Sequence, residues 1–255
     1  METLPASLSF RLDGRRALVT GAGRGIGVAI AAALGQAGAH LVLAARTFSE
    51  VEAVAEAIRQ GGGDAEPVEL DVRDLAQVDA LVSDGPPFDV VVSNAGTNRP
   101  KRLIDVTEED YEAVLGLNLK ASYFLARASA KRMIETNTHG SIIFMSSQMG
   151  HVGAPNRTLY CASKHAVEGL TKAMAVELAP YRIRVNAIAP TFVKTPMTEP
   201  FFQDRTFAEQ VLARIPLGRL SLPEEIAAAA VYLASEASRT VTGTSLKVDG
   251  GWTAQ

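Results

Sequence analysis

The chain has few of the residues that build disulfides or metal centres. Its 255 residues include one cysteine, Cys161, and four histidines at positions 40, 139, 151 and 165. A single cysteine excludes an internal disulfide, and dispersed histidines without a second cysteine show no zinc-ligand spacing. We therefore expect a protein without a metal, located in the cytoplasm.

Strong charge of one sign and long apolar runs are also lacking. The formal net charge is -3, the isoelectric point is near 5.9, and the basic residues are scattered. Such a chain has no field that would hold a nucleic acid or an anionic membrane surface. No run of 18 apolar residues occurs, and residues 1–13 have no basic segment followed by an apolar core. We expect neither secretion nor a membrane span.

The alternation of apolar strands and helices predicts an α/β fold. At 47% hydrophobic residues the chain can bury one substantial core, and neither a repeat nor a linker divides it. We predict one domain over residues 1–255. Within it, residues 190–218 hold four prolines and four phenylalanines. This profile fits either a flap over a site or a surface excursion packed by its own aromatics.

A glycine-rich turn near the N-terminus indicates an anion site. A strand at 16–19 leads into T-G-A-G-R-G-I-G at 20–27 and then into an alanine-rich helix. Glycines permit a tight turn and close backbone approach, and the N–H groups that begin a helix attract a pyrophosphate. The spacing differs from the commoner G-x-G-x-x-G. Its place between strand and helix nevertheless favours dinucleotide binding over an ordinary glycine loop.

The end of the second strand bears on the choice of dinucleotide. Residues 44–47 read A-A-R-T, where a dinucleotide fold contacts the adenosine ribose. An acidic residue there would favour NAD, and none is present. Arg46, beside Thr47, and Arg24 in the glycine turn could instead pair with a 2′-phosphate. We predict NADP(H), and leave NAD open because a solvated arginine at a strand end is the alternative.

Further polar residues follow or interrupt predicted elements. Asp71 and Val72 follow a strand at 66–70, where they could touch an adenine. A buried strand at 88–93 runs into N-A-G at 94–96, small residues that let the backbone lie close to a flat cofactor. Asn118 lies inside a long helix predicted over 107–133. Asparagine is unfavourable there, so this side chain is either solvated or needed for its amide.

The stretch from Ser147 to Lys164 can bring a hydroxyl, a phenol and an ammonium together. Ser147 ends an apolar strand, and a helix from about residue 158 places Tyr160 and Lys164 one turn apart on one face. A nearby cation favours phenolate and moves the phenol pKa toward the range useful for proton exchange. Taken alone, the spacing is common, and an ordinary Tyr/Lys pair on a helix surface explains it better.

In their order and spacing these motifs resemble the short-chain dehydrogenase/reductase family over residues 14–252. The matching segments are residues 20–27, 71–72, 93–96, 118, 146–148, 160–164, 184–190, 216–227 and 243–251. The resemblance implies a Rossmann fold with a doubly wound parallel sheet of about seven strands and helices on both faces. It also implies a homotetramer. Ser93 and Thr191 depart from the family's more frequent Asn and Gly.

The resemblance also implies residue roles. Tyr160 would be the general acid/base, Lys164 would lower its pKa and bind the nicotinamide ribose, Ser147 would hold the substrate oxygen, and Asn118 would fix a water. A carbonyl that accepts hydride develops negative charge on oxygen, and Ser147 and Tyr160 provide two donors. The implied cofactor-binding residues are Gly21, Arg24, Gly25, Ile26, Gly27, Arg46, Thr47, Asp71, Val72, Asn94, Ala95, Gly96, Tyr160, Lys164, Pro190, Val193 and Thr195.

The expected activity is that of an NAD(P)(H)-dependent oxidoreductase interconverting a ketone and a secondary alcohol, with a polyol, sugar acid or cyclic ketone as small-molecule substrate. A 3-oxoacyl thioester reductase and a non-catalytic dinucleotide-binding sensor are the alternatives. A sensor has no need of Tyr over Phe at position 160, which favours the enzyme. The candidate substrate-facing residues are Asn98, Arg99, Gln148, Met149, His151, Asn156, Thr191, Phe192 and Met197.

Overall fold

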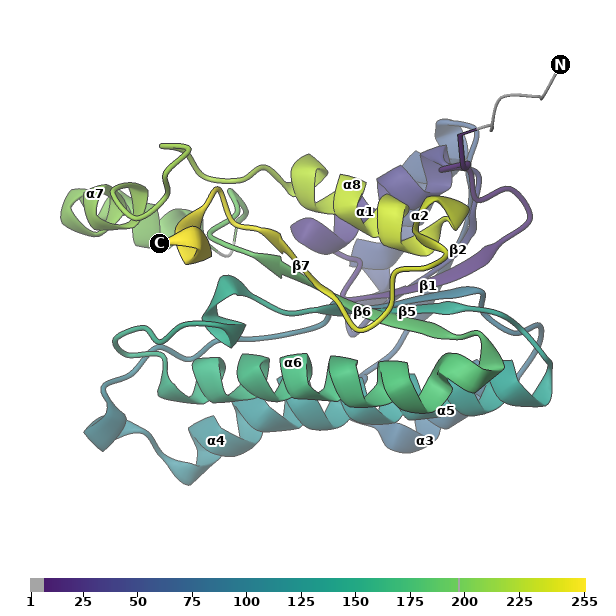
Figure 1. The fold of residues 1–255 in the computed structure, drawn as a ribbon, viewed down its shortest axis with the longest axis horizontal. Coiled ribbons are helices and arrows are strands. Elements are labelled where there is room, and N and C mark those ends of the chain that lie inside the picture. Colours follow the sequence, from purple (N-terminus) through teal and green to yellow (C-terminus); the bar gives the residue numbers. More distant parts are fainter. Residues whose placement is uncertain (1–6, 197) are drawn as a thin grey trace, which may run out of the picture.

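The computed structural model describes residues 7–196 and 198–255, and its centre is a parallel sheet of seven strands (Figure 1). The strand order is β3-β2-β1-β4-β5-β6-β7, and every neighbouring pair is parallel. The predicted doubly wound sheet is confirmed. The strands are β1 (Arg16–Thr20), β2 (His40–Ala45), β3 (Asp64–Glu69), β4 (Val90–Ser93), β5 (Ser141–Met145), β6 (Arg184–Pro190) and β7 (Ser245–Val248).

The strand order changes direction between β1 and β4. From β1 the chain moves outward through β2 and β3, returns to the other side of β1 as β4, and continues outward to β7. The loops that leave β1 and β4 therefore diverge and open a crevice at the carboxyl ends of these strands. A ligand site is expected at this point.

Helices cover both faces of the sheet (Figure 1). One face carries α1 (Ile26–Gln36), α2 (Phe48–Gln60) and α8 (Pro223–Ala234). The other carries α3 (Leu75–Ser83), α4 (Glu108–Leu115), α5 (Ser122–Glu135) and α6 (Thr158–Leu178). A sheet covered on both sides needs continuous apolar strands, and β4 and β5 are buried at every residue.

Alternate residues of each strand supply two separate cores. Val19 and Val92 pack with the first helical layer, whereas Leu18 and Val91 pack with the second. Successive strand side chains point to opposite faces, so one apolar strand serves both layers. The two cores fix the sheet, and with it the strand ends around the crevice.

The long helix predicted over 107–133 is interrupted. It begins as expected, because Thr107 and Asp110 form a reciprocal cap at the start of α4. Between α4 and α5, however, residues Gly116–Ala121 adopt a π-helical turn that contains Asn118. Such turns interrupt the regular backbone bonding and are frequent at functional sites.

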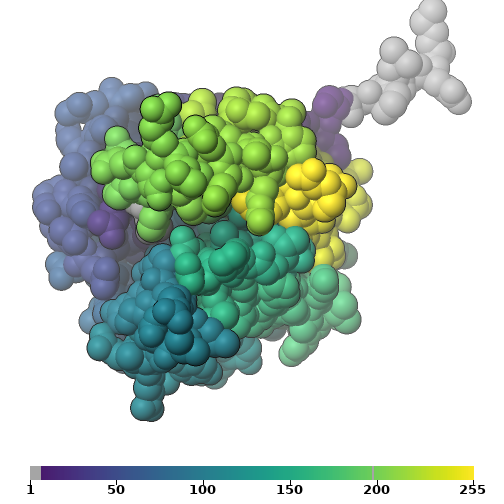
Figure 2. All heavy atoms as spheres, turned by 90° about the vertical axis from the view of Figure 1, so that its left-hand side faces the viewer, coloured from purple at the N-terminus to yellow at the C-terminus, as the bar shows by residue number. Residues whose placement is uncertain are grey.

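The segment 190–218 is partly helical and packed by aromatic rings. It holds a short 3₁₀ turn at Glu199–Gln203 and α7 (Arg205–Leu212). The ring of Phe192 meets those of Phe202 and Phe207 edge to face, at 5.7 and 5.8 Å between centroids. Figure 2 views the crevice end of the molecule and shows this light-green segment lying across it, above a hollow.

Candidate active site

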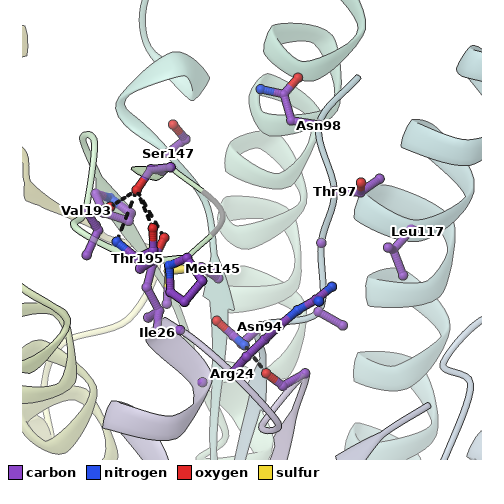
Figure 3. Close-up of a pocket in the computed structure, with 18 of the residues that line it drawn as sticks. Arg24, Ile26, Asn94, Thr97, Asn98, Leu117, Met145, Ser147, Val193 and Thr195 are labelled. Atoms are coloured by element: carbon purple, nitrogen blue, oxygen red, sulfur yellow. Dashed lines mark hydrogen bonds between the residues drawn. The ribbon is translucent and has the colours of Figure 1, made fainter. Parts of the chain in front are cut away.

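A cavity of about 420 Å³ occupies the crevice at the carboxyl ends of the strands. It is lined by the glycine turn and by residues that follow β2, β4, β5 and β6 (Figures 2 and 3). The structure brings together every residue predicted to bind the cofactor. It also brings Ser147, Tyr160 and Lys164 to the same cavity. Only Asn118, among the four predicted catalytic residues, is not part of the lining.

The glycine turn forms a cradle that side chains would fill. Gly21 and Gly25 have φ values of 65° and 60°, a region that favours glycine. A Cβ at Gly27 would lie 2.1 Å from the Gly21 carbonyl oxygen, so the turn closes only without one. Gly25 begins α1 without a side-chain cap, which leaves the first helical N–H groups for an anion. These features fit the pyrophosphate of a dinucleotide.

The amide of Asn94 fixes this turn against the end of β4. Its Nδ2 donates to the carbonyl oxygens of Thr20 at 3.0 Å and Gly21 at 3.1 Å (Figure 3). Its backbone N–H donates to the Thr20 hydroxyl at 3.2 Å. The two strand ends that bound the crevice are thereby held at one separation, which positions the cradle before any ligand binds.

At the adenosine end, cations and one carboxylate share the cavity wall. Arg24 and Arg46 are exposed and line the cavity, as predicted. Asp71 lines it too, and the hydrogen bonds from Arg73 hold the pKa of its carboxyl below the ordinary value. Glu50, which the sequence reasoning missed, also lies here, in the first turn of α2. Its place in the first turn of the helix that follows β2, four residues after Arg46, could have indicated it.

Tyr160 and Lys164 lie on one face of α6, as the four-residue spacing predicted. The Lys164 ammonium lies 5.5 Å from the centre of the Tyr160 ring. It is buried and donates to the carbonyl oxygen of Met145, at the end of β5, at 2.7 Å. Burial lowers the pKa of Lys164 to about 8, against an opposing effect of Glu168.

The pKa of Tyr160 differs from the expectation that its neighbour would depress it. Burial raises the pKa of Tyr160 above its ordinary value, and the nearby Ser147 hydroxyl acts in the opposite direction. The reason is that Lys164 donates to a backbone carbonyl, whereas the phenol lies in a desolvated pocket. The phenol is therefore held in its protonated form.

Ser147, two residues after the end of β5, lines the cavity together with Tyr160. Its Oγ donates to Gln148 Oε1 at 2.7 Å and accepts from the Met149 N–H at 3.1 Å. The serine is buried and in an extended conformation. These contacts fix its position in the cavity wall near Tyr160.

Asn118 lies behind this wall with its amide engaged within the protein. Its Oδ1 accepts from the Thr97 N–H at 2.8 Å, and its Nδ2 donates to Thr97 O at 2.9 Å and Ser163 Oγ at 3.1 Å. The side chain thus joins the π-helical turn to the loop after β4 and to α6. Of the two possibilities left open by the sequence, it is the needed amide and not a solvated one.

The predicted substrate-facing residues divide into two groups. Asn98, Gln148, Met149, Thr191 and Phe192 line the cavity. Asn98 Oδ1 and Thr191 Oγ1 are buried there without a hydrogen-bond partner among the residues that the structure describes. Arg157, which the sequence reasoning missed, lines it as well.

The other candidates are turned to different partners. Arg99 pairs with Glu109 at 3.0 Å and Asp110 at 3.2 Å, so its guanidinium is already neutralised. His151 Nε2 lies 2.9 Å from Ser245 Oγ, in a cluster with the buried Glu168. Asn156 occupies a left-handed turn outside the lining, and Met197 lies outside the described residues.

Across 7–196 and 198–255, no helix combines the length and apolarity needed to cross a membrane. The same residues contain no group of three or more His, Cys, Asp or Glu placed to hold a metal ion.

Fold and cavity together define a dinucleotide-binding α/β protein, and comparisons with known proteins name its family. The pattern described as "Enoyl-(Acyl carrier protein) reductase" matches residues 21–253. L-xylulose reductase from Bos taurus is 38% identical over 247 residues, covering 97% of this chain and 100% of the relative. The 3-oxoacyl-[acyl-carrier-protein] reductase from Thermotoga maritima is 39% identical, covering 95% and 99%.

A solved structure is also similar to this chain over nearly its whole length. The crystal structure of a putative NAD(P)-dependent gluconate 5-dehydrogenase from Beutenbergia cavernae, with bound NADP, superposes with a TM-score of 0.93. It is 41% identical and covers 96% of this chain and 99% of that one. The chain belongs to the short-chain dehydrogenase/reductase family and is an NAD(P)-dependent oxidoreductase.

The closed glycine turn gives a test of the cradle. In Gly27→Ala the new methyl group collides with the Gly21 carbonyl, and we expect affinity for NADPH to fall at least about tenfold. Calorimetric titration of NADPH measures this, with circular dichroism to confirm folding. Gly169→Ala is the control, since a Cβ there meets open space on α6. Unchanged affinity in a folded Gly27→Ala protein would contradict the cradle.

Proposed function

We propose that the protein is an NADP(H)-dependent oxidoreductase that interconverts a ketone and a secondary alcohol on a small polyhydroxylated substrate, a polyol or sugar acid. One observation carries the proposal: a partly buried phenol, a buried serine hydroxyl and a buried ammonium meet in the cavity that begins at the glycine turn. The polar lining by Asn98 and Gln148 suits hydroxyl groups. Relatives named for xylulose and gluconate support this branch.

Tyr160 is the proposed general acid and base. When bound, the nicotinamide cofactor supplies or accepts the hydride. During reduction the Tyr160 phenol donates its proton to the substrate oxygen, and the raised pKa of this phenol keeps that proton available. The Ser147 hydroxyl turns its single proton from Gln148 Oε1 to the same oxygen, and this hydrogen bond stabilises the charge developing there. In oxidation the phenol first loses its proton to solvent, and the Tyr160 phenolate, stabilised by Lys164, then accepts the alcohol proton.

Lys164 and Asn118 support this proton transfer. The Lys164 ammonium, with a pKa of about 8, is charged at neutral pH and stabilises the phenolate that remains after donation. We assign to it also the ribose hydroxyls of the nicotinamide half. Asn118 positions the π-helical turn against α6, and the carbonyl groups freed in such a turn suit a proton-relay water.

The preference for NADP(H) rests on the two arginines at the adenosine end. Arg24 and Arg46 offer guanidinium groups to a 2′-phosphate, and a structure similar to this chain holds NADP. Glu50 shares this wall and disfavours a further anion, so NADH remains a usable second cofactor.

The domain extent, the flap, the oligomeric state and the location of the protein are also proposals. We propose one domain over residues 1–255, with 190–218 as a flap that covers the substrate, because Phe192 and Phe201 of this segment line the cavity. We further propose a cytoplasmic homotetramer without nucleic acid or membrane partners, supported by family membership and the moderate net charge.

Reduction of a 3-oxoacyl thioester is the second candidate activity. The relative from Thermotoga maritima favours it. A substrate panel separates the two: 5-keto-D-gluconate, L-xylulose, cyclohexanone and acetoacetyl thioester, each followed by loss of NADPH absorbance. We expect the polyhydroxylated ketones to be reduced fastest. Reduction of only the thioester would replace the proposed branch, and tight NADPH binding without any turnover in either direction would favour a sensor.

Replacing the phenol tests the chemistry directly. Tyr160→Phe keeps the ring and removes only the proton donor, so we expect kcat to fall by about 10²- to 10⁴-fold while NADPH affinity stays within about twofold. Stopped-flow turnover and calorimetry measure the two quantities. Near-normal turnover in this variant would remove Tyr160 from the mechanism.

The cofactor preference has its own test. Arg46→Asp repels a 2′-phosphate and can bond a 2′-hydroxyl, so we expect the ratio of kcat/KM for NADPH over NADH to fall by about 10- to 100-fold. Steady-state kinetics with both cofactors measure it. Arg239→Asp, at an exposed arginine far along the chain, is the control. The same ratio in wild type and Arg46→Asp would show that Arg46 does not read the ribose.

A further inference from the structure

Arg157 is a buried cation in the wall of the active-site cavity. It directly precedes α6, three positions before Tyr160, and only 9% of its surface is exposed. It lines the cavity together with Phe201 of the segment 190–218, and its guanidinium carbon lies 5.6 Å from the centre of that ring. Arg157 and Tyr160 line the same cavity, which places the charge on the wall that carries the phenol.

The guanidinium has few partners for so buried a group. Its five N–H donors make one hydrogen bond among the described residues, a long one of 3.4 Å from Nη1 to the carbonyl oxygen of Asn156. No carboxylate of the described residues lies within ion-pair distance. Arg184, by contrast, has several hydrogen-bond partners. Its guanidinium donates to Ser238 Oγ and to two carbonyl oxygens near the end of α8.

No nitrogen of the Arg157 guanidinium is among the fully enclosed polar atoms that lack a partner in the described part of the chain, so its remaining N–H groups are open to the cavity and available to a ligand. Burial lowers the pKa of Arg157, and the nearby Tyr160 and Cys161 act in the opposite direction. Taking a charge out of water is unfavourable unless an opposite charge and hydrogen bonds replace the lost hydration. The face of the Phe201 ring supplies only a weak cation–π contact. An anionic group entering the cavity would supply what is missing.

We propose that Arg157 binds a carboxylate of the substrate, which makes the natural substrate a hydroxy or keto sugar acid and not a neutral polyol. The inference deepens the proposed function and rests on it. A planar carboxylate can accept two parallel N–H bonds from a guanidinium, whereas a neutral polyol leaves the charge unpaired.

The cavity also has an acceptor suited to the hydroxyl groups of such an acid. Asn98 Oδ1 is buried without a partner among the described residues, and it can accept from a substrate hydroxyl. Asn98 and Ser147 lie toward one end of the site in Figure 3, and Arg24 of the glycine turn lies toward the other. Arg157 belongs to the wall at the start of α6 and not to the glycine turn, so the anion proposed for it is distinct from the cofactor phosphates.

Matched substrates test the assignment by kinetics. The wild type is compared with Arg157→Gln on 5-keto-D-gluconate, neutral D-fructose and D-fructose 6-phosphate, at saturating NADPH. We expect Arg157→Gln to raise KM for the keto acid by about 30- to 100-fold with little change in kcat, and to leave D-fructose unchanged. Arg157→Lys should restore part of the loss. Arg102→Gln, at an exposed arginine outside the cavity lining, is the control.

Binding without turnover separates this inference from the proposed function. With saturating NADP⁺, we expect gluconate to raise Tm of the wild type more than the neutral analogue D-glucitol does, and Arg157→Gln to lose most of that difference. An equal gluconate effect in both proteins, or an equal loss for keto acid and fructose, would overturn the assignment. A clear preference for D-fructose 6-phosphate would replace the carboxylate by a phosphate. Absent turnover with this binding pattern intact would count against the proposed function alone.

Discussion

The hydrogen bond from Lys164 to the Met145 carbonyl joins α6 to the end of β5, and the geometry of the site depends on it. It orients a cation in a place where burial opposes the charge, and it places that cation under the same helical face as Tyr160. Because β5 is central in the sheet and buried at every residue, its carbonyl is a rigid acceptor. Tyr160 and Lys164 are thus positioned by the core and not by surface loops.

The crevice beside the glycine turn forms where the strand order changes direction, between β1 and β4. Strands β1 and β4 lie side by side, and the loops that leave them part to form the crevice. Asn94 ties those loops together, and the glycine turn closes because Gly27 has no side chain. The proposed cofactor and substrate positions share one cavity, in which we propose that the cations at the adenosine end and Arg157 bind different anions.

Patterns among residues close together in the sequence were sufficient to predict the fold and the residues that line the cavity. Apolar runs of strand length, the glycine turn and the four-residue spacing of Tyr160 and Lys164 depend on neighbours along the chain, and the structure confirms where they lie. The remaining features depend on distant partners. His151 is turned toward Ser245, which lies 94 residues away. The π-helical turn follows from bonds between Asn118 and the loop after β4, which a helical pattern cannot reveal. Arg157 resembles any surface arginine until its burial is known.

A protonated phenol that works beside a charged ammonium gives catalysis a defined dependence on pH. The measurement is kcat/KM for ketone reduction at saturating NADPH, from about pH 6 to about pH 10. Below its pKa of about 8 Lys164 is charged, and the pKa of Tyr160 is raised, so the rate should be constant at low pH and fall as pH rises through about 8. A rate that stays constant to about pH 10, or rises above pH 8, would contradict the account.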